Sequence, residues 1–312
     1  MSSDAADEAE AVQSDVCCAN CGVAEIDDIK LEECDGCDLV KYCGDKCREE
    51  HQPQHEGECK KRKAKLHDDN LFEQPGSSHH GECPICFFPM PLEPCKSVLY
   101  TCCFSLICNG CAHGNYISNK HDKVKACSCP FCREPAAENK EENKKRELER
   151  AEANVPAALR EMGSKRHREG DYDSALEYLT KAAELGDLNA YHLLGRMYYQ
   201  GEGVEKDEEK ALQHLEKAAI GGHAQARSKV AFIEGKNGNM ERSVKHFIIA
   251  ANLGEEKSMK GLWRHYSDGN ITKEELDATL RTHQAALDAM KSPQREAAER
   301  ARHKYKYFSK DP

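Results

Sequence analysis

The second half of the chain combines helical periodicity with internal repetition. Paired alanines recur at intervals of 36 and 32 residues, at Ala182-Ala183, Ala218-Ala219 and Ala250-Ala251. A glycine follows each pair, and apolar residues fill the preceding turn at Leu179, Leu215 and Phe247. Such a period predicts stacked helix–turn–helix units that share an apolar core.

Small residues recur at the matching place of the preceding helix, where they let paired helices approach closely: Gly163, Gly195 and Ala231. Three units are predicted, and a fourth around residues 263–286 is a degraded unit that caps the stack. The repeats are expected to span 155–291, after a charged helical linker at 134–154. A basic amphipathic helix is expected at 294–307, within a C-terminal stretch of 292–312.

The segment LLGRMYYQGEGVEKDEEKALQHLEKAA resembles the Sel-like branch of the tetratricopeptide repeat family. Its extended loop, Gly201 to Asp207, is characteristic of that branch. The resemblance implies an adaptor with a concave surface for a partner protein or peptide. Tyr198, Tyr199 and Trp263 are interpreted as core or groove-wall aromatics, and no repeat residue is assigned as a partner contact.

All 18 cysteines lie in the first half of the chain, none after Cys132. Residues 1–16 are acidic, predicted to be disordered, and lack the basic leader and apolar run of a signal peptide. No stretch approaches the ~20 apolar residues of a membrane span. We therefore expect a reducing, intracellular compartment, cytoplasmic or nuclear, in which clustered thiols bind metal. The formal net charge of −10 argues against general affinity for nucleic acid.

The first cysteine block, residues 17–59, carries four closely spaced pairs of metal-binding side chains: Cys18 and Cys21, Cys34 and Cys37, Cys43 and Cys47, His55 and Cys59. Zinc takes four tetrahedral sulfur or nitrogen donors, so eight donors predict two structural zinc ions. A segment this short and polar cannot bury a sufficient core without metal. Cys17 is the alternative to Cys18. His51 is the alternative to His55 and is expected to be exposed on a short helix.

With Tyr42 before Cys43, this block resembles the MYND zinc finger. The resemblance implies interleaved ligation, with Cys18, Cys21, Cys43 and Cys47 on one ion and Cys34, Cys37, His55 and Cys59 on the other. Gln52 stands where family members usually carry a tryptophan that helps form a groove for proline-rich peptides. The linker 60–82 begins with a basic run at 60–65, interpreted as a solvated helix face or a nuclear address.

The second cysteine block opens with Cys83-Pro84-Ile85-Cys86, continues with Cys102, Cys103, Cys108 and Cys111, and closes with Cys129-Pro130-Phe131-Cys132-Arg133. These motifs resemble a RING finger over residues 83–133. Ser105 falls where the usual histidine ligand would stand, whereas Cys103 fits an all-cysteine variant. Cross-bracing is then implied, with Cys83, Cys86, Cys108 and Cys111 on one zinc and Cys102, Cys103, Cys129 and Cys132 on the other. His113 and His121 are alternatives to Cys102, and Cys95 and Cys127 are left as free thiols.

A RING finger implies recruitment of a ubiquitin-conjugating enzyme, a form of catalysis by positioning. The contact positions that carry over are Ile85, Pro130 and Arg133, the last because a guanidinium fork can bridge two partners. Tyr116 is the nearest counterpart of the family's bulky aromatic residue. The alternative is a rigid module that binds proteins without ligase activity, in signalling or transcriptional regulation.

Other enzyme classes are disfavoured. Each cysteine cluster supplies a full four-ligand shell, which leaves a zinc ion no open position for hydrolysis. The sequence contains no phosphate-binding glycine loop and no nucleophile elbow. The predicted fold class is therefore a pair of small zinc-stabilised modules that bind four zinc ions, followed by an all-α helical-repeat solenoid. The predicted function is a protein-binding adaptor, with ubiquitin ligase activity as the open question.

Overall fold

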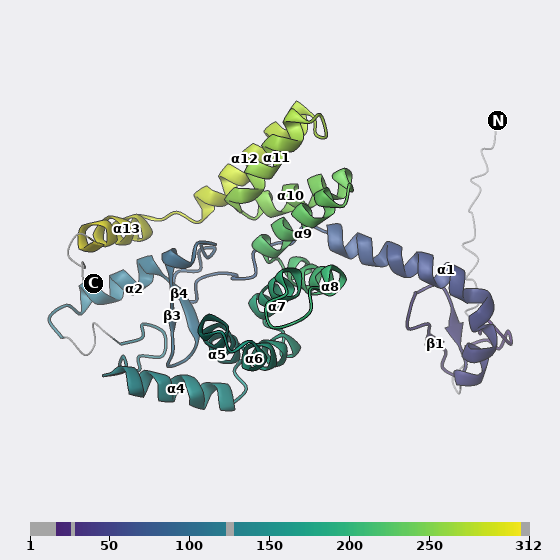
Figure 1. The fold of residues 1–312 in the computed structure, drawn as a ribbon, viewed down its shortest axis with the longest axis horizontal. Coiled ribbons are helices and arrows are strands. Elements are labelled where there is room, and N and C mark those ends of the chain that lie inside the picture. The colour runs from purple at the N-terminus through teal and green to yellow at the C-terminus, as the bar shows by residue number, and fades with distance from the viewer. Residues whose placement is uncertain (1–16, 26–28, 123–127, 307–312) are drawn as a thin grey trace, which may run out of the picture. The chain divides into compact units, whose positions relative to one another are not determined.

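The computed structural model describes residues 17–25, 29–122 and 128–306, and the chain forms two compact units, Met1–Leu71 and Phe72–Pro312 (Figure 1). The predicted fold class is confirmed: cysteine-rich modules precede a mostly helical repeat region. The predicted free thiol Cys127 lies outside the described residues.

The first unit has little regular structure apart from one helix. Strands β1 (Glu32–Glu33) and β2 (Lys41–Tyr42) pair antiparallel, and helix α1 (Asp45–Phe72) follows. Its core is small and centres on Cys18, Leu31 and Tyr42. So small an apolar core cannot by itself offset the conformational entropy lost on folding.

Helix α1 corrects one expectation about the first cysteine block. His51 was predicted to be exposed on a short helix, but α1 has 28 residues and His51 is half-buried. The His51 ring accepts or donates a hydrogen bond at 3.1 Å from the Tyr42 hydroxyl, which holds it against the module. The same helix carries the basic run, where Arg62 forms an ion pair with Asp38.

The second cysteine module, residues 83–133, lies near the beginning of the second unit. The 3₁₀ helix η1 (Pro94–Lys96) leads into an antiparallel hairpin, β3 (Ser97–Tyr100) and β4 (Ser105–Cys108), followed by helix α2 (Asn109–Ser118). At the end of the hairpin turn Phe104 adopts a left-handed conformation, with φ of 53°. Its side chain is buried in the core of the first repeat, where Leu99 also packs.

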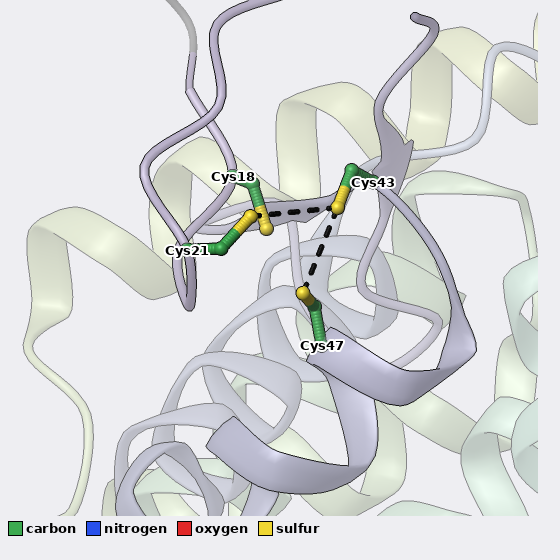
Figure 2. A group of neighbouring side chains, drawn as sticks. All are labelled: Cys18, Cys21, Cys43 and Cys47. Carbon is green, nitrogen blue, oxygen red and sulfur yellow. Dashed lines mark hydrogen bonds between the residues drawn. The ribbon is translucent and has the colours of Figure 1, made fainter.

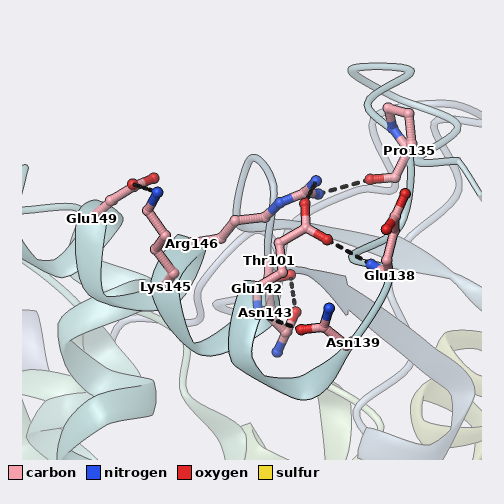
Figure 3. Close-up of polar contacts among 9 residues, drawn as sticks. All are labelled: Thr101, Pro135, Glu138, Asn139, Glu142, Asn143, Lys145, Arg146 and Glu149. Carbon is pink, nitrogen blue, oxygen red and sulfur yellow. Dashed lines mark hydrogen bonds and ion pairs between the residues drawn. The ribbon is translucent and has the colours of Figure 1, made fainter.

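Helix α4 (Lys140–Glu152) lies beside this hairpin and is anchored at its beginning by polar contacts (Figure 3). The Asn139 side chain caps the helix by accepting from the Glu142 amide at 2.9 Å. Thr101, in the hairpin turn, donates to the Asn143 side chain at 2.7 Å, and Arg146 donates to the Pro135 carbonyl at 2.7 Å. The segment predicted as a charged helical linker thus contains helix α4, which is fastened to the cysteine module.

The repeat region is a succession of antiparallel helix pairs (Figure 1): α5 (Pro156–Glu169) and α6 (Tyr172–Glu184), α7 (Leu188–Gln200) and α8 (Glu208–Ile220), α9 (Ala224–Lys236) and α10 (Met240–Asn252), α11 (Glu256–Ser267) and α12 (Lys273–Ala289). The paired alanines and the residues of the preceding turn are buried. Tyr199 packs on this core, whereas Trp263 is half exposed.

The recurring small residues are required by close helix contacts. A Cβ atom at Gly163 would lie 2.7 Å from the Leu179 Cγ, and one at Gly195 would lie 2.6 Å from the Leu215 Cγ. Real side chains do not approach so closely, so these glycines set the distance between the paired helices. After each alanine pair, Gly186, Gly222 and Gly254 adopt positive φ, as a glycine that terminates a helix does.

The last helix, α13 (Pro293–Lys306), packs against α2 of the second cysteine module. The chain thus returns from the repeats to the module that precedes them. Within the described part of the chain, no helix is both long enough and apolar enough to span a membrane.

Candidate metal centres

Site 1 lies in the first unit and brings together four cysteines from two loops and a helix: Cys18, Cys21, Cys43 and Cys47 (Figure 2). The Cys43 sulfur lies 3.5 Å from that of Cys21 and 3.6 Å from that of Cys47. Cys47 is on the first turn of α1, while Cys18 and Cys21 flank a tight turn. Residues far apart in sequence therefore converge on one point.

Site 2 groups Cys34, Cys37, His55 and Cys59. The Cys37 sulfur lies 3.2 Å from Nε2 of His55, and the Cys34 sulfur lies 3.7 Å from that of Cys59. Gly36 lies between the first two ligands, and a Cβ there would be 2.7 Å from the Cys59 sulfur. Glycine leaves the sulfur room beside the backbone.

Sites 3 and 4 lie in the second cysteine module and use the remaining donors: Cys83, Cys86, Cys108 and Cys111 for site 3, and Cys102, Cys103, Cys129 and Cys132 for site 4. In site 3 the sulfurs lie 3.8 Å apart for Cys86 and Cys108 and 3.9 Å apart for Cys83 and Cys111. In site 4 they lie 3.3 Å apart for Cys102 and Cys132 and 3.8 Å apart for Cys103 and Cys129. In a tetrahedral site with Zn–S bonds of about 2.3 Å, neighbouring sulfurs lie about 3.8 Å apart. The spacing therefore fits zinc.

Adjacent cysteines can serve one site because they lie in the turn of the β3–β4 hairpin. The positive φ of Phe104 bends the backbone directly after Cys103, and its amide donates to the Tyr100 carbonyl at 2.7 Å. Both side chains then reach the loop of Cys129 and Cys132. His113 and His121, the alternatives to Cys102, belong to none of the metal-binding groups among the described residues.

Three of the cysteine pairs share one loop geometry that sequence spacing alone did not reveal. The residue after the second cysteine has positive φ: Gly22 at 74°, Phe87 at 56° and Arg133 at 63°. Two backbone hydrogen bonds close each loop. The amide of the positive-φ residue donates to the carbonyl of the first cysteine of the pair. The amide of that first cysteine donates to the carbonyl of the residue that follows the positive-φ residue. Non-glycine residues adopt this conformation at a cost of roughly 1–2 kcal/mol, so the loops are constrained by the sites they form.

Within each metal-binding group the thiols differ in pKa, some lowered and others raised. Burial raises the pKa of the Cys18 thiol, but three backbone amides, the first that of Cys21, outweigh it and lower the pKa to about 6. Amides led by that of Cys108 likewise overcome burial and lower the pKa of Cys83 to about 7. Contact with Cys21 raises the pKa of Cys43 to about 12. Gathered thiolates repel one another, and a bound dication removes that repulsion.

The residues predicted to contact a ubiquitin-conjugating enzyme lie on the two loops that hold sites 3 and 4. Ile85 and Arg133 are exposed, and Pro130 is half-buried. Tyr116, on α2, is 47% exposed. Phe87 and Phe131 were not singled out from the sequence, yet they are 70% and 51% exposed. Of the alternative or leftover thiols, Cys17 and Cys95 are exposed and outside the four sites.

Comparison with protein families identifies two of the modules. A MYND finger model matches residues 18–59, and a Sel1 repeat model matches residues 156–187, 188–223 and 231–255. Site 1 and site 2 lie within the first match. The helix pairs α5–α6 and α7–α8 coincide with the first two repeat matches.

The curated relatives match only short stretches. The alginate biosynthesis protein AlgK of Pseudomonas putida is 44% identical over 50 residues, which cover 16% of this chain and 10% of AlgK. The chitin synthase regulatory factor 4 of Schizosaccharomyces pombe is 28% identical over 89 residues, 28% of this chain and 14% of that protein. The putative beta-lactamase HcpC of Helicobacter pylori is 41% identical over 51 residues, 16% of this chain and 18% of HcpC. The chain thus spans less than a fifth of each of these relatives.

Two solved structures are similar to parts of this chain. One is a Sel1 repeat protein from Oxalobacter formigenes, with a TM-score of 0.42 and 23% identity over 57% of this chain and 74% of that chain. The other is c5321 from uropathogenic Escherichia coli, described as displaying an SLR fold, with a TM-score of 0.39 and 21% identity over 65% of this chain and 42% of that one. The chain carries a MYND finger at residues 18–59 and three Sel1 repeats between residues 156 and 255.

Proposed function

We propose that the chain is a protein-interaction adaptor in which two zinc ions brace each cysteine module and the helical repeats hold a partner protein. The supporting observation is that sixteen donor atoms gather in four closed groups of four. Zinc in a closed shell of four protein donors is structural, whereas catalytic zinc keeps a position for water or substrate. When bound, zinc would therefore supply rigidity, and recognition would fall to the surfaces that it holds in place.

Metal analysis tests this proposal directly. We expect four zinc ions per chain after purification without chelator. Cys37→Ser and Cys86→Ser should each lower the content to about three, because each removes one ligand from a different site and structural sites need all four. The matched control is Cys95→Ser, a thiol outside the sites that should leave four ions bound. A wild-type content near two would mean that one module does not bind zinc.

A second candidate function is recruitment of a ubiquitin-conjugating enzyme by the second cysteine module, which is RING-like in its motifs. It is supported by the exposure of Ile85 and Arg133 on the two site-forming loops, in company with exposed aromatic side chains. Aromatic and arginine side chains are the residues that most often dominate protein interfaces. Exposed apolar groups on rigid loops incur little entropic cost on binding.

An autoubiquitination assay with a panel of conjugating enzymes separates the two functions. If the module is a ligase, wild-type protein forms chains with at least one enzyme, and Ile85→Ala or Arg133→Ala reduces the rate by at least tenfold, which corresponds to about 1.4 kcal/mol of lost interaction. Val98→Ala is the matched control, an exposed apolar residue on β3. Absence of chains with every conjugating enzyme would leave only the non-catalytic adaptor.

A further inference from the structure

Helix α13 packs against α2 of the second cysteine module and contacts that module through two arginines: Arg302 donates to the Cys95 carbonyl at 3.1 Å, and Arg295 makes the more extensive contact. The backbone of Arg295 approaches α2 so closely that a Cβ at Gly110 would lie 2.9 Å from its nitrogen. Glycine at position 110 therefore permits the contact. The Arg295 side chain then extends over the loop that follows Cys83, more than 200 residues earlier in the sequence.

The guanidinium of Arg295 is held by four acceptors. Nη1 donates to the Pro89 carbonyl at 2.7 Å and to the Met290 carbonyl at 2.6 Å. Nη2 donates to the Phe88 carbonyl at 3.2 Å and to the sulfur of Cys86 at 3.6 Å. The guanidinium also lies 5.7 Å from the centre of the Phe88 ring. This planar group is therefore fixed in orientation, with one edge toward a site 3 sulfur.

The charge of Arg295 lacks a carboxylate partner. Among the described residues, no Asp or Glu lies within ion-pairing distance of this guanidinium, although it is half-buried and its Nε is buried without a hydrogen bond. A cation in this position needs compensating negative charge. Four thiolates around one Zn²⁺ carry a net charge of −2, and they are the anionic group in contact with Arg295.

We infer that Arg295 stabilises the zinc–thiolate group of site 3 by donating to the Cys86 sulfur. The same contact fastens helix α13 to the module while zinc is bound. The inference rests on the proposed binding of zinc. Residues that hydrogen-bond to metal ligands tune the metal, and their loss typically costs 10–100-fold in metal affinity.

The test uses the full chain loaded with zinc and a chromogenic chelator in competition. For Arg295→Gln we expect one of the four ions to be lost at a 10–100-fold lower chelator concentration, with the other three unchanged. Arg295→Lys keeps the positive charge but lacks the planar fork of donors. The chelator concentration at which it loses this ion should lie between those of the wild type and Arg295→Gln. Arg300→Gln, on an exposed side chain of the same helix, is the matched control and should release zinc as the wild type does.

Thiol alkylation followed by mass spectrometry locates the released ion. In Arg295→Gln the four cysteines of site 3 should become reactive while those of site 4 stay protected. Hydrogen exchange in α13 should also rise in the wild type once zinc is removed. If Arg295→Gln binds four ions, releases them at the same chelator concentrations as Arg300→Gln and shows the same cysteine alkylation, the proposed role of Arg295 is wrong. A wild type with reactive site 3 cysteines and fewer than four ions would overturn the zinc proposal as well.

Discussion

Removal of zinc is expected to unfold both cysteine modules and leave the repeat helices folded. Structural zinc contributes about 10–16 kcal/mol of apparent free energy in small domains at pH 7, and here the apolar cores of the two modules consist largely of the ligands themselves. The repeat cores contain none of the proposed zinc ligands: apart from Phe104, which the second module contributes, they are built mainly from apolar side chains of the helices, chiefly alanine and leucine. A strong zinc chelator should therefore unfold residues 17–59 and 83–133 together, a larger loss of structure than any single substitution should cause.

Limited proteolysis measured by mass spectrometry checks this expectation. With chelator, cleavage should appear within the two modules, residues 156–289 should stay protected, and far-UV circular dichroism should keep most of its helical signal. Added zinc should reverse the cleavage pattern if no chain has yet been cut. Protection of the modules in excess chelator, or loss of the whole helical signal, would contradict the prediction.

The second large effect is expected on mild acidification, from a cluster of histidines in the second unit. The rings of His79 and His223 stack with centres 3.9 Å apart, and those of His80 and His192 adjoin them. His79 also bonds to the Asn189 side chain at 3.2 Å, and its amide donates to the Gly222 carbonyl at 3.0 Å. The cluster thus seats the segment that precedes the second cysteine module on the repeats.

Burial lowers the pKa of all four imidazoles. The pKa of His79 falls to about 3 and that of His192 to about 4, and those of His80 and His223 are lowered too. The charged groups that act on the cluster are mostly cationic: Arg160, Arg196, Lys229 and Lys257, against the single carboxylate of Asp187. Protonated rings would therefore meet both desolvation and repulsion.

The sign of the pH effect follows from these shifts. A histidine whose pKa is lowered by folding stabilises the native state above its unfolded pKa of about 6.5, and this stabilisation is lost as pH falls toward the folded value. Between pH 7.5 and 5, His79 and His192 should each remove about 2 kcal/mol from the free energy of unfolding. Urea denaturation of the second unit at a series of pH values measures the slope of the free energy of unfolding against pH.

His79→Gln is the informative variant, because glutamine can still donate to Asn189 but does not titrate. It should lose part of the slope between pH 7.5 and 5, while His121→Gln, an exposed control, should keep the wild-type slope. Zinc loss at low pH would affect both variants alike and cancels in the comparison. Equal slopes in His79→Gln and His121→Gln would show that this ring does not govern the acid response.

The sequence was most informative where the signal is local or periodic. The 32- and 36-residue intervals place the helix pairs, because each repeat buries the same positions. The metal-binding groups follow from short cysteine spacings and the interleaving implied by the family resemblances. Even Cys102 and Cys103, adjacent and unusual, converge on one group once the hairpin turn is seen.

Sequence reasoning did not identify features that depend on contacts distant along the chain. His79 and Asn189 are 110 residues apart, and Arg295 and Cys86 are 209 apart, so no spacing pattern could pair them. Arg295 was grouped only with the basic face of its helix. The length of α1 was also missed: only a short helix was expected around His51, whereas α1 continues past Pro53 to Phe72.

The second cysteine module shares a buried core with the repeats, because Phe104 and Leu99 of its hairpin pack against the first repeat. Its turn carries the site 4 ligands Cys102 and Cys103, and the next residue is buried in the core of the first repeat. A displacement of this turn therefore moves a metal ligand and a repeat contact together. If the module and the repeats each bind a partner, as proposed, we expect a partner that shifts this turn to alter the affinity for the other.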